Sequence, residues 1–136
     1  MQPEVRRLPD EHPDIVLLAT EWQPRALIRA QLIEEGFDVV AMDAWSMARR
    51  HLKAGLKPRL AIVDLKGLPH PAAVLADLRT LMTADRVLVV TAIGTVPQAE
   101  IDSLGFRALS RPLTIQDLVR IVVETIGKLI RAKSPE

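Results

Sequence analysis

The chain has 136 residues, of which 49% are hydrophobic, and its 18 Lys and Arg residues nearly balance its 17 Asp and Glu residues. This length and composition suit one folded domain with a single core and exclude an intrinsically disordered chain. A net charge of +1 gives no electrostatic reason to expect nucleic acid or a membrane surface as a partner. Aromatic residues, at 3%, are too few to form a platform for stacked bases.

The sequence contains no cysteine, which excludes disulfides and thiol chemistry. No uncharged run approaches the ~20 residues that a membrane-spanning helix needs. The N-terminus is charged and rich in proline, and it lacks the apolar stretch of a signal peptide. We therefore expect a cytoplasmic protein in which residues 1–13 form a flexible N-terminal arm.

Five short apolar runs predict β-strands. The runs at 15–19, 60–63 and 87–91 are continuous and rich in Val, Ile and Leu, as is typical of strands buried on both faces. The other two runs span residues 37–41 and 107–109.

Apolar residues at helical spacing fill the intervals between these runs and the stretch after the last one. A proline or a capping residue begins most of these helices, and a glycine ends three of them. The signals are Pro24 and Gly36 for the first helix, Asp43 and Gly55 for the second, Thr95, Gln98 and Gly105 for the fourth, and Thr114 for the fifth. The third helix is predicted at about 72–81, and the fifth continues to about 132.

This alternation of strands and helices predicts an α/β fold, a doubly wound parallel sheet with helices on both faces. We expect one domain at residues 14–132 and a short tail at 133–136. In such a sheet the functional crevice lies beyond the carboxyl ends of the strands. The residues at those ends are Ala19, Thr20 and Glu21 after the first strand, Asp64 after the third, Thr91 after the fourth and Arg111 after the fifth.

Taken alone, these residues have ordinary structural interpretations. Asp64 can be a loop-opening aspartate that accepts hydrogen bonds from nearby backbone N–H groups. Thr91 can be a β-branched strand residue, and Arg111 a surface residue. The three histidines have no metal-ligand spacing, and no glycine-rich phosphate loop follows the first strand, so we expect no resident cofactor.

Four segments nevertheless occur in the order and spacing of one known family. They are "ALIRAQLIEEGFDVV" (first helix and second strand), "LAIVDL" (third strand), "VLVVTA" (fourth strand) and "LSRPLT" (fifth strand and the segment after it). Over roughly residues 14–132 the chain resembles the CheY-like receiver domain of bacterial two-component response regulators. The resemblance implies a flavodoxin-like sheet of five strands in the order 2-1-3-4-5, with five helices.

The resemblance also assigns roles to the residues at the sheet edge. In this family an acidic pair after the first strand and the aspartate of the third strand hold Mg²⁺, and that aspartate takes a phosphoryl group from a histidine kinase. Asp64 matches the phosphate acceptor and Thr91 the hydroxyl residue of the fourth strand. Pro112 matches the proline that follows a lysine in the family and is often preceded by a cis bond.

Two departures weaken the match where the chemistry would occur. The acidic pair falls on Ala19 and Thr20, and the lysine falls on Arg111. Mg²⁺ requires oxygen ligands in near-octahedral geometry, so Asp64 without that pair is a poor magnesium site. Glu21 is the one nearby acid that can substitute. We favour a degenerate site in which Arg111 pairs directly with Asp64.

These residues therefore indicate an atypical receiver that is no enzyme and acts mainly as a protein–protein interaction module in phosphorelay signalling, with a histidine kinase or an effector as partner. One alternative is a working receiver that is still phosphorylated on Asp64 by a histidine kinase, and only this alternative requires Mg²⁺. A less favoured alternative is a flavodoxin-like ligand-binding domain or enzyme that uses the same crevice, since the chain shows no catalytic pair, metal set or phosphate loop.

The fifth helix carries more apolar residues than a core-facing stripe needs. Its first stripe is Leu118, Ile121, Val122 and Leu129, and its second is Val119, Val123, Ile126 and Ile130. Together with Ile115 they cover roughly 200° of the helix, whereas a surface helix buries somewhat more than 100°. The second stripe is therefore predicted to be a partner interface, through which the chain forms a homodimer or docks another signalling protein.

Overall fold

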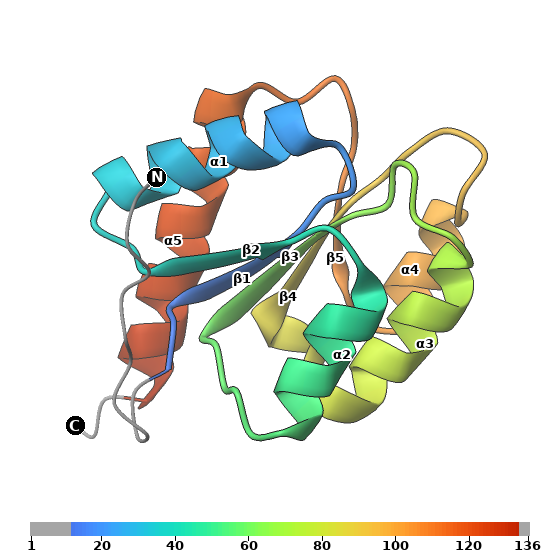
Figure 1. Ribbon diagram of the computed structural model, residues 1–136, viewed down its shortest axis with the longest axis horizontal. Coiled ribbons are helices and arrows are strands. Elements are labelled where there is room, and N and C mark those ends of the chain that lie inside the picture. The colour runs from blue at the N-terminus through green and yellow to red at the C-terminus, as the bar shows by residue number, and fades with distance from the viewer. Residues whose placement is uncertain (1–11, 134–136) are drawn as a thin grey trace.

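A computed structural model describes residues 12–133 and shows a three-layer α/β fold (Figure 1). Five parallel strands form one sheet in the order β2-β1-β3-β4-β5, which confirms the predicted fold class and strand order. The strands are β1 (Ile15–Leu18), β2 (Val39–Met42), β3 (Leu60–Asp64), β4 (Val87–Val90) and β5 (Arg107–Leu109). The helices are α1 (Trp22–Glu34), α2 (Trp45–Lys53), α3 (Pro71–Leu81), α4 (Gln98–Ser103) and α5 (Ile115–Lys133), and a 3-10 turn, η1 (Ala84–Arg86), precedes β4.

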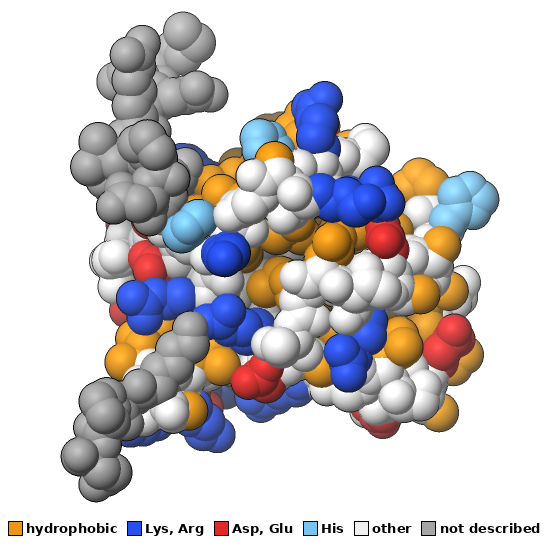
Figure 2. All heavy atoms as spheres, turned by 90° about the horizontal axis from the view of Figure 1, so that it is seen from below, with side chains coloured by type: hydrophobic (Ala, Val, Ile, Leu, Met, Phe, Trp, Pro, Cys, Tyr) orange, Lys and Arg blue, Asp and Glu red, His pale blue; other side chains and the backbone are white. Residues whose placement is uncertain are grey.

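Helices cover both faces of the sheet, as right-handed crossovers between parallel strands require. Figure 1 shows α1 and α5 on one face and α2, α3 and α4 on the other. Two hydrophobic clusters correspond to these two interfaces. Figure 2 shows the molecule from below, where Lys and Arg side chains lie at separate places and acidic side chains are fewer. The basic side chains on this face do not gather into one compact site.

The pleat of β3 decides which way Asp64 points. Successive strand residues face opposite sides of a sheet. Leu60 and Ile62 pack into the cluster under α1 and α5, whereas Ala61 and Val63 pack into the cluster under α2, α3 and α4. Asp64 continues the first series, so its carboxylate lies on the α1 and α5 side of the sheet edge.

Several predicted element ends differ from the structure. The prediction that Thr95 and Gln98 form a capping box is wrong, because the Thr95 hydroxyl donates to the carbonyl of Ala92 at 2.6 Å and α4 begins only at Gln98. Asp43 does not cap α2, whose N-cap position is Ala44 without a side-chain hydrogen bond. Pro24 lies in the first turn of α1 and not at its first residue. Strand β2 lies two residues later than predicted at its start and one residue later at its end.

Helix α5 begins as predicted but is buried more deeply than the prediction allows. The Thr114 hydroxyl accepts the backbone N–H of Asp117 at 3.0 Å, which caps the first turn. Val119 and Ile126 are buried in the core cluster, so their assignment to an exposed partner interface is wrong. The other two residues of that stripe, Val123 and Ile130, are exposed.

The predicted N-terminal arm and C-terminal tail fall almost entirely outside the described residues. Within these residues, His12 accepts the backbone N–H of Lys57 through Nδ1 at 3.1 Å, and Pro13 is buried. Residue 133, which was assigned to the tail, is the last residue of α5. No helix between residues 12 and 133 combines the length and the apolar character needed to cross a bilayer.

Candidate functional site

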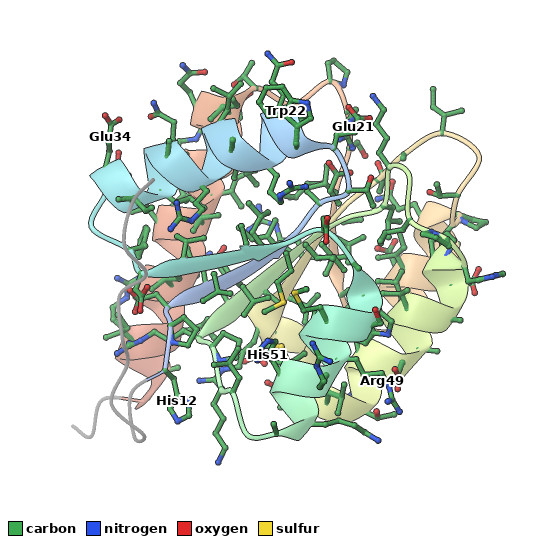
Figure 3. The ribbon with its side chains drawn as sticks, viewed as in Figure 1. His12, Glu21, Trp22, Glu34, Arg49 and His51 are labelled. Carbon is green, nitrogen blue, oxygen red and sulfur yellow. The ribbon has the colours of Figure 1, made fainter. Side chains whose placement is uncertain are left out.

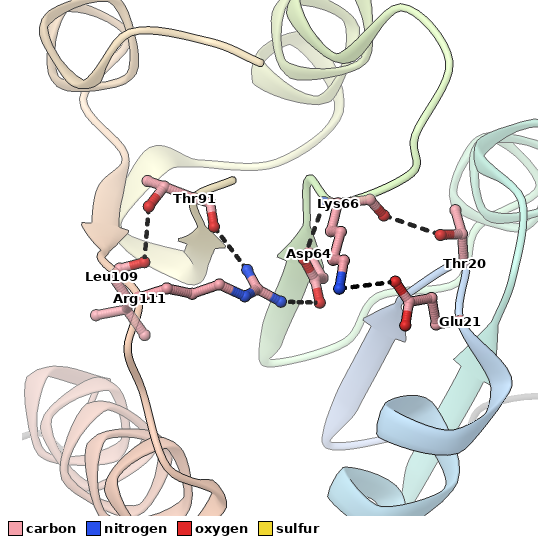
Figure 4. Close-up of polar contacts among 7 residues, drawn as sticks. All are labelled: Thr20, Glu21, Asp64, Lys66, Thr91, Leu109 and Arg111. Carbon is pink, nitrogen blue, oxygen red and sulfur yellow. Dashed lines mark hydrogen bonds and ion pairs between the residues drawn. The ribbon is translucent and has the colours of Figure 1, made fainter. Parts of the chain in front are cut away.

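The candidate site lies where the loops after β1, β3, β4 and β5 converge, at the carboxyl edge of the sheet (Figure 4). Asp64 ends β3 and is paired in register with Val90, the last residue of β4. The central strand, β3, therefore places one carboxylate at the middle of this edge.

Both oxygens of the Asp64 carboxylate accept hydrogen bonds. Oδ1 accepts the backbone N–H of Lys66 at 3.0 Å, and Oδ2 accepts Nη2 of Arg111 at 2.7 Å. The Asp64 side chain is only 9% exposed. A buried carboxylate needs such partners because its charge loses most of its hydration. The charge of Asp64 is thus balanced from within the protein.

Arg111 joins β3 to β4 through its guanidinium group. Its Nη1 donates to the backbone carbonyl of Thr91 at 2.6 Å, while its Nη2 binds Asp64. The Arg111 side chain is 38% exposed, whereas the carboxylate that it binds is almost fully buried. The peptide bond between Arg111 and Pro112 is cis, as the resemblance to receiver domains implies.

The Thr91 side chain faces away from this ion pair. Its hydroxyl points to the carbonyl of Leu109 at 3.4 Å, which is long for an O–H···O hydrogen bond, and its backbone N–H donates to the same carbonyl at 2.9 Å (Figure 4). Thr91 therefore contributes its carbonyl to the site, and its hydroxyl lies against β5.

On the other side of Asp64, the loop after β1 is bound to Lys66. The Thr20 hydroxyl donates to the Lys66 carbonyl at 2.8 Å, and Glu21 Oε1 pairs with Lys66 Nζ at 3.1 Å. Glu21 is thus engaged by Lys66. Lys66 was not predicted as a site residue, because its only signal in the sequence is its position two residues after Asp64.

Gly67 allows this loop to lie close to Thr20. Its φ of +78° belongs to the left-handed region, where side chains are strained. A Cβ atom at this position would also collide with the Thr20 hydroxyl oxygen. The loop after β3 therefore requires glycine here for both its conformation and its packing.

The donor set does not fit the Mg²⁺ ion that receiver domains hold. Ala19 offers no side-chain oxygen, and its carbonyl and that of Thr20 accept Nη1 of Arg25 at 2.9 and 3.2 Å. The two positions therefore supply no anionic oxygen ligand, and their carbonyls are already bound by a guanidinium. Across residues 12–133, no three side chains of His, Cys, Asp or Glu are grouped so that they can hold a metal ion.

Comparison with known proteins identifies the fold that carries this site. No protein-family model and no curated protein matches the sequence. Among solved structures, a CheY-like response regulator receiver domain protein from Methanospirillum hungatei JF-1 is similar, with a TM-score of 0.77, 16% identity and coverage of 90% of this chain and 99% of that one. The chain has the receiver fold.

Two further receiver structures are similar to a comparable degree. The signal receiver domain of a putative Luxo repressor protein from Vibrio parahaemolyticus has a TM-score of 0.72 and 22% identity, with coverage of 90% of this chain and 95% of that one. A response regulator receiver domain protein from Clostridium thermocellum has a TM-score of 0.69 and 20% identity, with coverage of 87% and 97%. These TM-scores support the receiver fold, whereas the chemistry of the site has to be inferred from the residues of this chain.

On this receiver fold, the predicted site residues divide into two groups. The structure brings Asp64 and Arg111 into contact, as predicted, and adds the backbone of Thr91. Thr20 and Glu21 form a second group around Lys66. The loop after β3 links the two groups, because the backbone N–H of Lys66 donates to the carboxylate of Asp64.

Proposed function

We propose that this chain is an atypical receiver of a phosphorelay system, which acts as a protein–protein interaction module and does not take up phosphate through a magnesium-dependent route. The observation that carries the proposal is the ion pair between Arg111 and Asp64. A carboxylate must bring a free oxygen to the phosphoryl group, and the two negative charges must be neutralised during attack. Each oxygen of Asp64 already accepts a hydrogen bond from the protein, and the cation paired with the carboxylate is a side chain and not a metal ion.

The residues around the pair support the same conclusion. In phosphoryl transfer the metal ion supplies much of the charge neutralisation and orients the reacting groups. Ala19 and Thr20 cannot replace the acidic pair, and Glu21 is paired with Lys66. What remains is a receiver scaffold whose central carboxylate is paired with a side chain, and such a scaffold suits recognition of another protein.

Phosphorylation is tested directly by incubating the chain with Mg²⁺ and acetyl phosphate and measuring its intact mass. A receiver that carries both acidic residues serves as the positive control, and Asp64→Asn as the negative control. We expect no phosphate adduct on the chain while the positive control is modified. An adduct that disappears in Asp64→Asn would refute the proposal.

Metal binding is tested separately by tryptophan fluorescence. Trp22 is 69% exposed and directly follows Glu21 at the start of α1 (Figure 3). We expect millimolar Mg²⁺ to leave its emission unchanged relative to a matched ionic strength of NaCl. A saturable change that is absent in both Glu21→Gln and Asp64→Asn would show that a metal binds between these two carboxylates.

A working receiver is the second candidate, and one observation favours it. The guanidinium of Arg111 is partly exposed, and guanidinium binds phosphate oxygens well. If the pair opens, Arg111 is positioned to hold a phosphoryl group on Asp64. The mass measurement separates the two candidates, because only a working receiver yields the adduct.

The partner surface that we propose is the exposed part of α5, marked by Val123 and Ile130. Its occupant is a second copy of the chain or another signalling protein. The double variant Val123→Lys with Ile130→Lys should stay folded and lower the molar mass measured by light scattering if the chain self-associates through α5. Met47→Lys, which alters an exposed apolar residue of α2, is the matched control. A mass that is unchanged by the double variant excludes self-association through this surface.

A further inference from the structure

A cavity of about 120 Å³ lies beside the Arg111–Asp64 pair, between the sheet and the helices α1 and α5. Its walls are mainly apolar and come from β1, β3 and β4, from α1 and α5, and from the segment after β5. Ile28, Ile62, Val90 and Leu118 are typical of the lining. The cavity is partly open to the surface, so a small molecule can enter it.

The size and lining suit a small apolar molecule. An engineered apolar cavity of roughly 150 Å³ stays dry and binds benzene or xenon. The cavity described here is slightly smaller and is lined mainly by aliphatic side chains, but it opens to the surface and is polar at one end. It is far below the ~300 Å³ at which sites for drug-sized ligands begin, so its occupant is limited to about one six-membered ring.

One end of the cavity is polar and offers both a donor and an acceptor. Asp64 and Arg111 both line it. Each Asp64 oxygen accepts one hydrogen bond from the protein and has capacity for another, and Arg111 has more N–H groups than its bonds to Asp64 and Thr91 use. A single hydroxyl group on the occupant can therefore donate to Asp64 and accept from Arg111.

The charge of this end selects against ionised occupants. Asp64 and Arg111 form a pair with no net charge. An anion would be attracted by Arg111 but repelled by Asp64. A cation would be attracted by Asp64 but repelled by Arg111. Either would also lose its hydration in an apolar cavity, which is costly for a full charge.

We propose that this cavity is a binding site for a small neutral molecule that has an apolar body of about one ring and a single hydroxyl group. The apolar body lies against the aliphatic walls, and the hydroxyl group lies on the Arg111–Asp64 pair. An occupant contacts both the sheet edge and α5. The proposed function depends on the same two regions, because the sheet edge holds the Arg111–Asp64 pair and α5 carries the proposed partner surface. The binding itself does not depend on that function.

The test is a titration of ¹³C-labelled protein, followed through its methyl signals by NMR, with phenol, toluene and benzoate. Phenol and toluene have the same shape and differ by hydroxyl and methyl, and benzoate adds a negative charge. We expect phenol to shift the methyl signals of Ile28, Ile62 and Leu118 saturably, while Ile101, in the core on the opposite face, stays unchanged. Phenol should bind about tenfold more tightly than toluene, as a hydrogen bond to a charged group implies, and benzoate should bind more weakly than phenol.

Two matched variants locate the site. Val90→Ile adds one methylene group at the cavity wall, and Val123→Ile adds the same group on the exposed side of α5. Val90→Ile should weaken phenol binding at least about fivefold, since a well-packed site tolerates an extra methylene poorly. Val123→Ile should not change it. The proposal is overturned if the wild-type methyl shifts do not saturate, if they spread to Ile101, or if toluene or benzoate binds as tightly as phenol.

Discussion

Two arginine–aspartate pairs of nearly equal length lie in different surroundings. Arg111 and Asp64 meet at 2.7 Å at the sheet edge, and Arg49 and Asp77 meet at 2.6 Å between α2 and α3. The Asp64 side chain is 9% exposed, whereas that of Asp77 is 30% exposed. Figure 3 shows Arg49 on α2, near the periphery of the molecule. The two pairs have nearly the same distance, so the distance does not show which pair matters more for stability. The burial of the carboxylate does.

The difference determines what each arginine contributes. Water can solvate Asp77 if Arg49 is removed, and Trp45 Nε1 still donates to the same oxygen at 3.2 Å. Asp64 would keep one backbone N–H and little water. An exposed pair contributes little to stability, whereas removal of one member of a buried pair leaves an uncompensated charge. The sheet edge therefore depends on Arg111 far more than the α2–α3 interface depends on Arg49.

The largest expected effect is that of Arg111→Ala. This change leaves Asp64 buried and unpaired, and we expect the free energy of unfolding to fall by about 2–4 kcal/mol, at or somewhat below the range for a broken buried pair because Arg111 is itself partly exposed. Urea unfolding followed by circular dichroism measures the change. A loss below about 0.5 kcal/mol, the range of an exposed pair, would remove the distinction between the two pairs.

A second variant separates the unpaired charge from lost packing. In the Arg111→Ala background, Asp64→Asn removes the negative charge and keeps the shape of the side chain. It should restore part of the lost stability, because the penalty arises from the charge. The four proteins form a double-mutant cycle, and a coupling energy near zero would show that the two side chains act independently.

Gly67→Ala tests the other half of the sheet edge. The added Cβ would collide with the Thr20 hydroxyl oxygen at a φ of +78°, so we expect a loss of about 1–3 kcal/mol in the free energy of unfolding. Gly36→Ala is the matched control, because Gly36 has a φ of +97° but no heavy atom within 4 Å of an added Cβ. The excess loss in Gly67→Ala measures the contact with Thr20. Equal losses would show that backbone strain alone requires glycine.

The arrangement of the sheet could be predicted because burial on both faces requires an apolar residue at every position of a strand. The continuous runs in β1 and β4 meet this requirement. Helix ends are harder to predict, because a hydroxyl group has several possible partners. The Thr114 hydroxyl caps α5, whereas the Thr95 hydroxyl bonds to the carbonyl of Ala92. Both residues have the sequence pattern of a cap.

The site could be predicted in part for a similar reason. A buried carboxylate without a bound metal ion needs another cation beside it. Arg111 was the residue of the family pattern that could supply this cation, and the structure shows the contact. The role of Lys66 could not be predicted, because its pairing with Glu21 depends on a loop that Gly67 shapes. The number of apolar residues around α5 could not show which of them are buried and which are exposed. Val119 packs in the core, whereas Val123 is exposed.

Arg49→Ala should have a smaller effect than either change at the sheet edge. Asp77 keeps access to water and to Trp45 Nε1, so we expect a loss of about 0.2–1 kcal/mol, typical of exposed ion pairs. Raising the salt concentration to 1 M should reduce this difference, because salt screens exposed charges. The same salt should change the effect of Arg111→Ala less. A loss above about 2 kcal/mol for Arg49→Ala would contradict the ranking by burial.

The smallest effect concerns a third carboxylate, Asp117, in the first turn of α5. Hydrogen bonds with Thr114 lower the pKa of Asp117 below its ordinary value of 3.8, and the nearby Arg120 lowers the pKa further. The folded pKa is thus below the unfolded pKa, so the ionised carboxylate stabilises the fold above pH 3.8, and this contribution is lost as the pH falls through the folded pKa. NMR titration of the carboxyl carbon measures the pKa directly. Thr114→Ala should raise the pKa more than Arg120→Ala does, because the hydrogen bonds are the larger cause. The reverse order would mean that Arg120, and not the capping residue Thr114, has the larger effect on the pKa of Asp117.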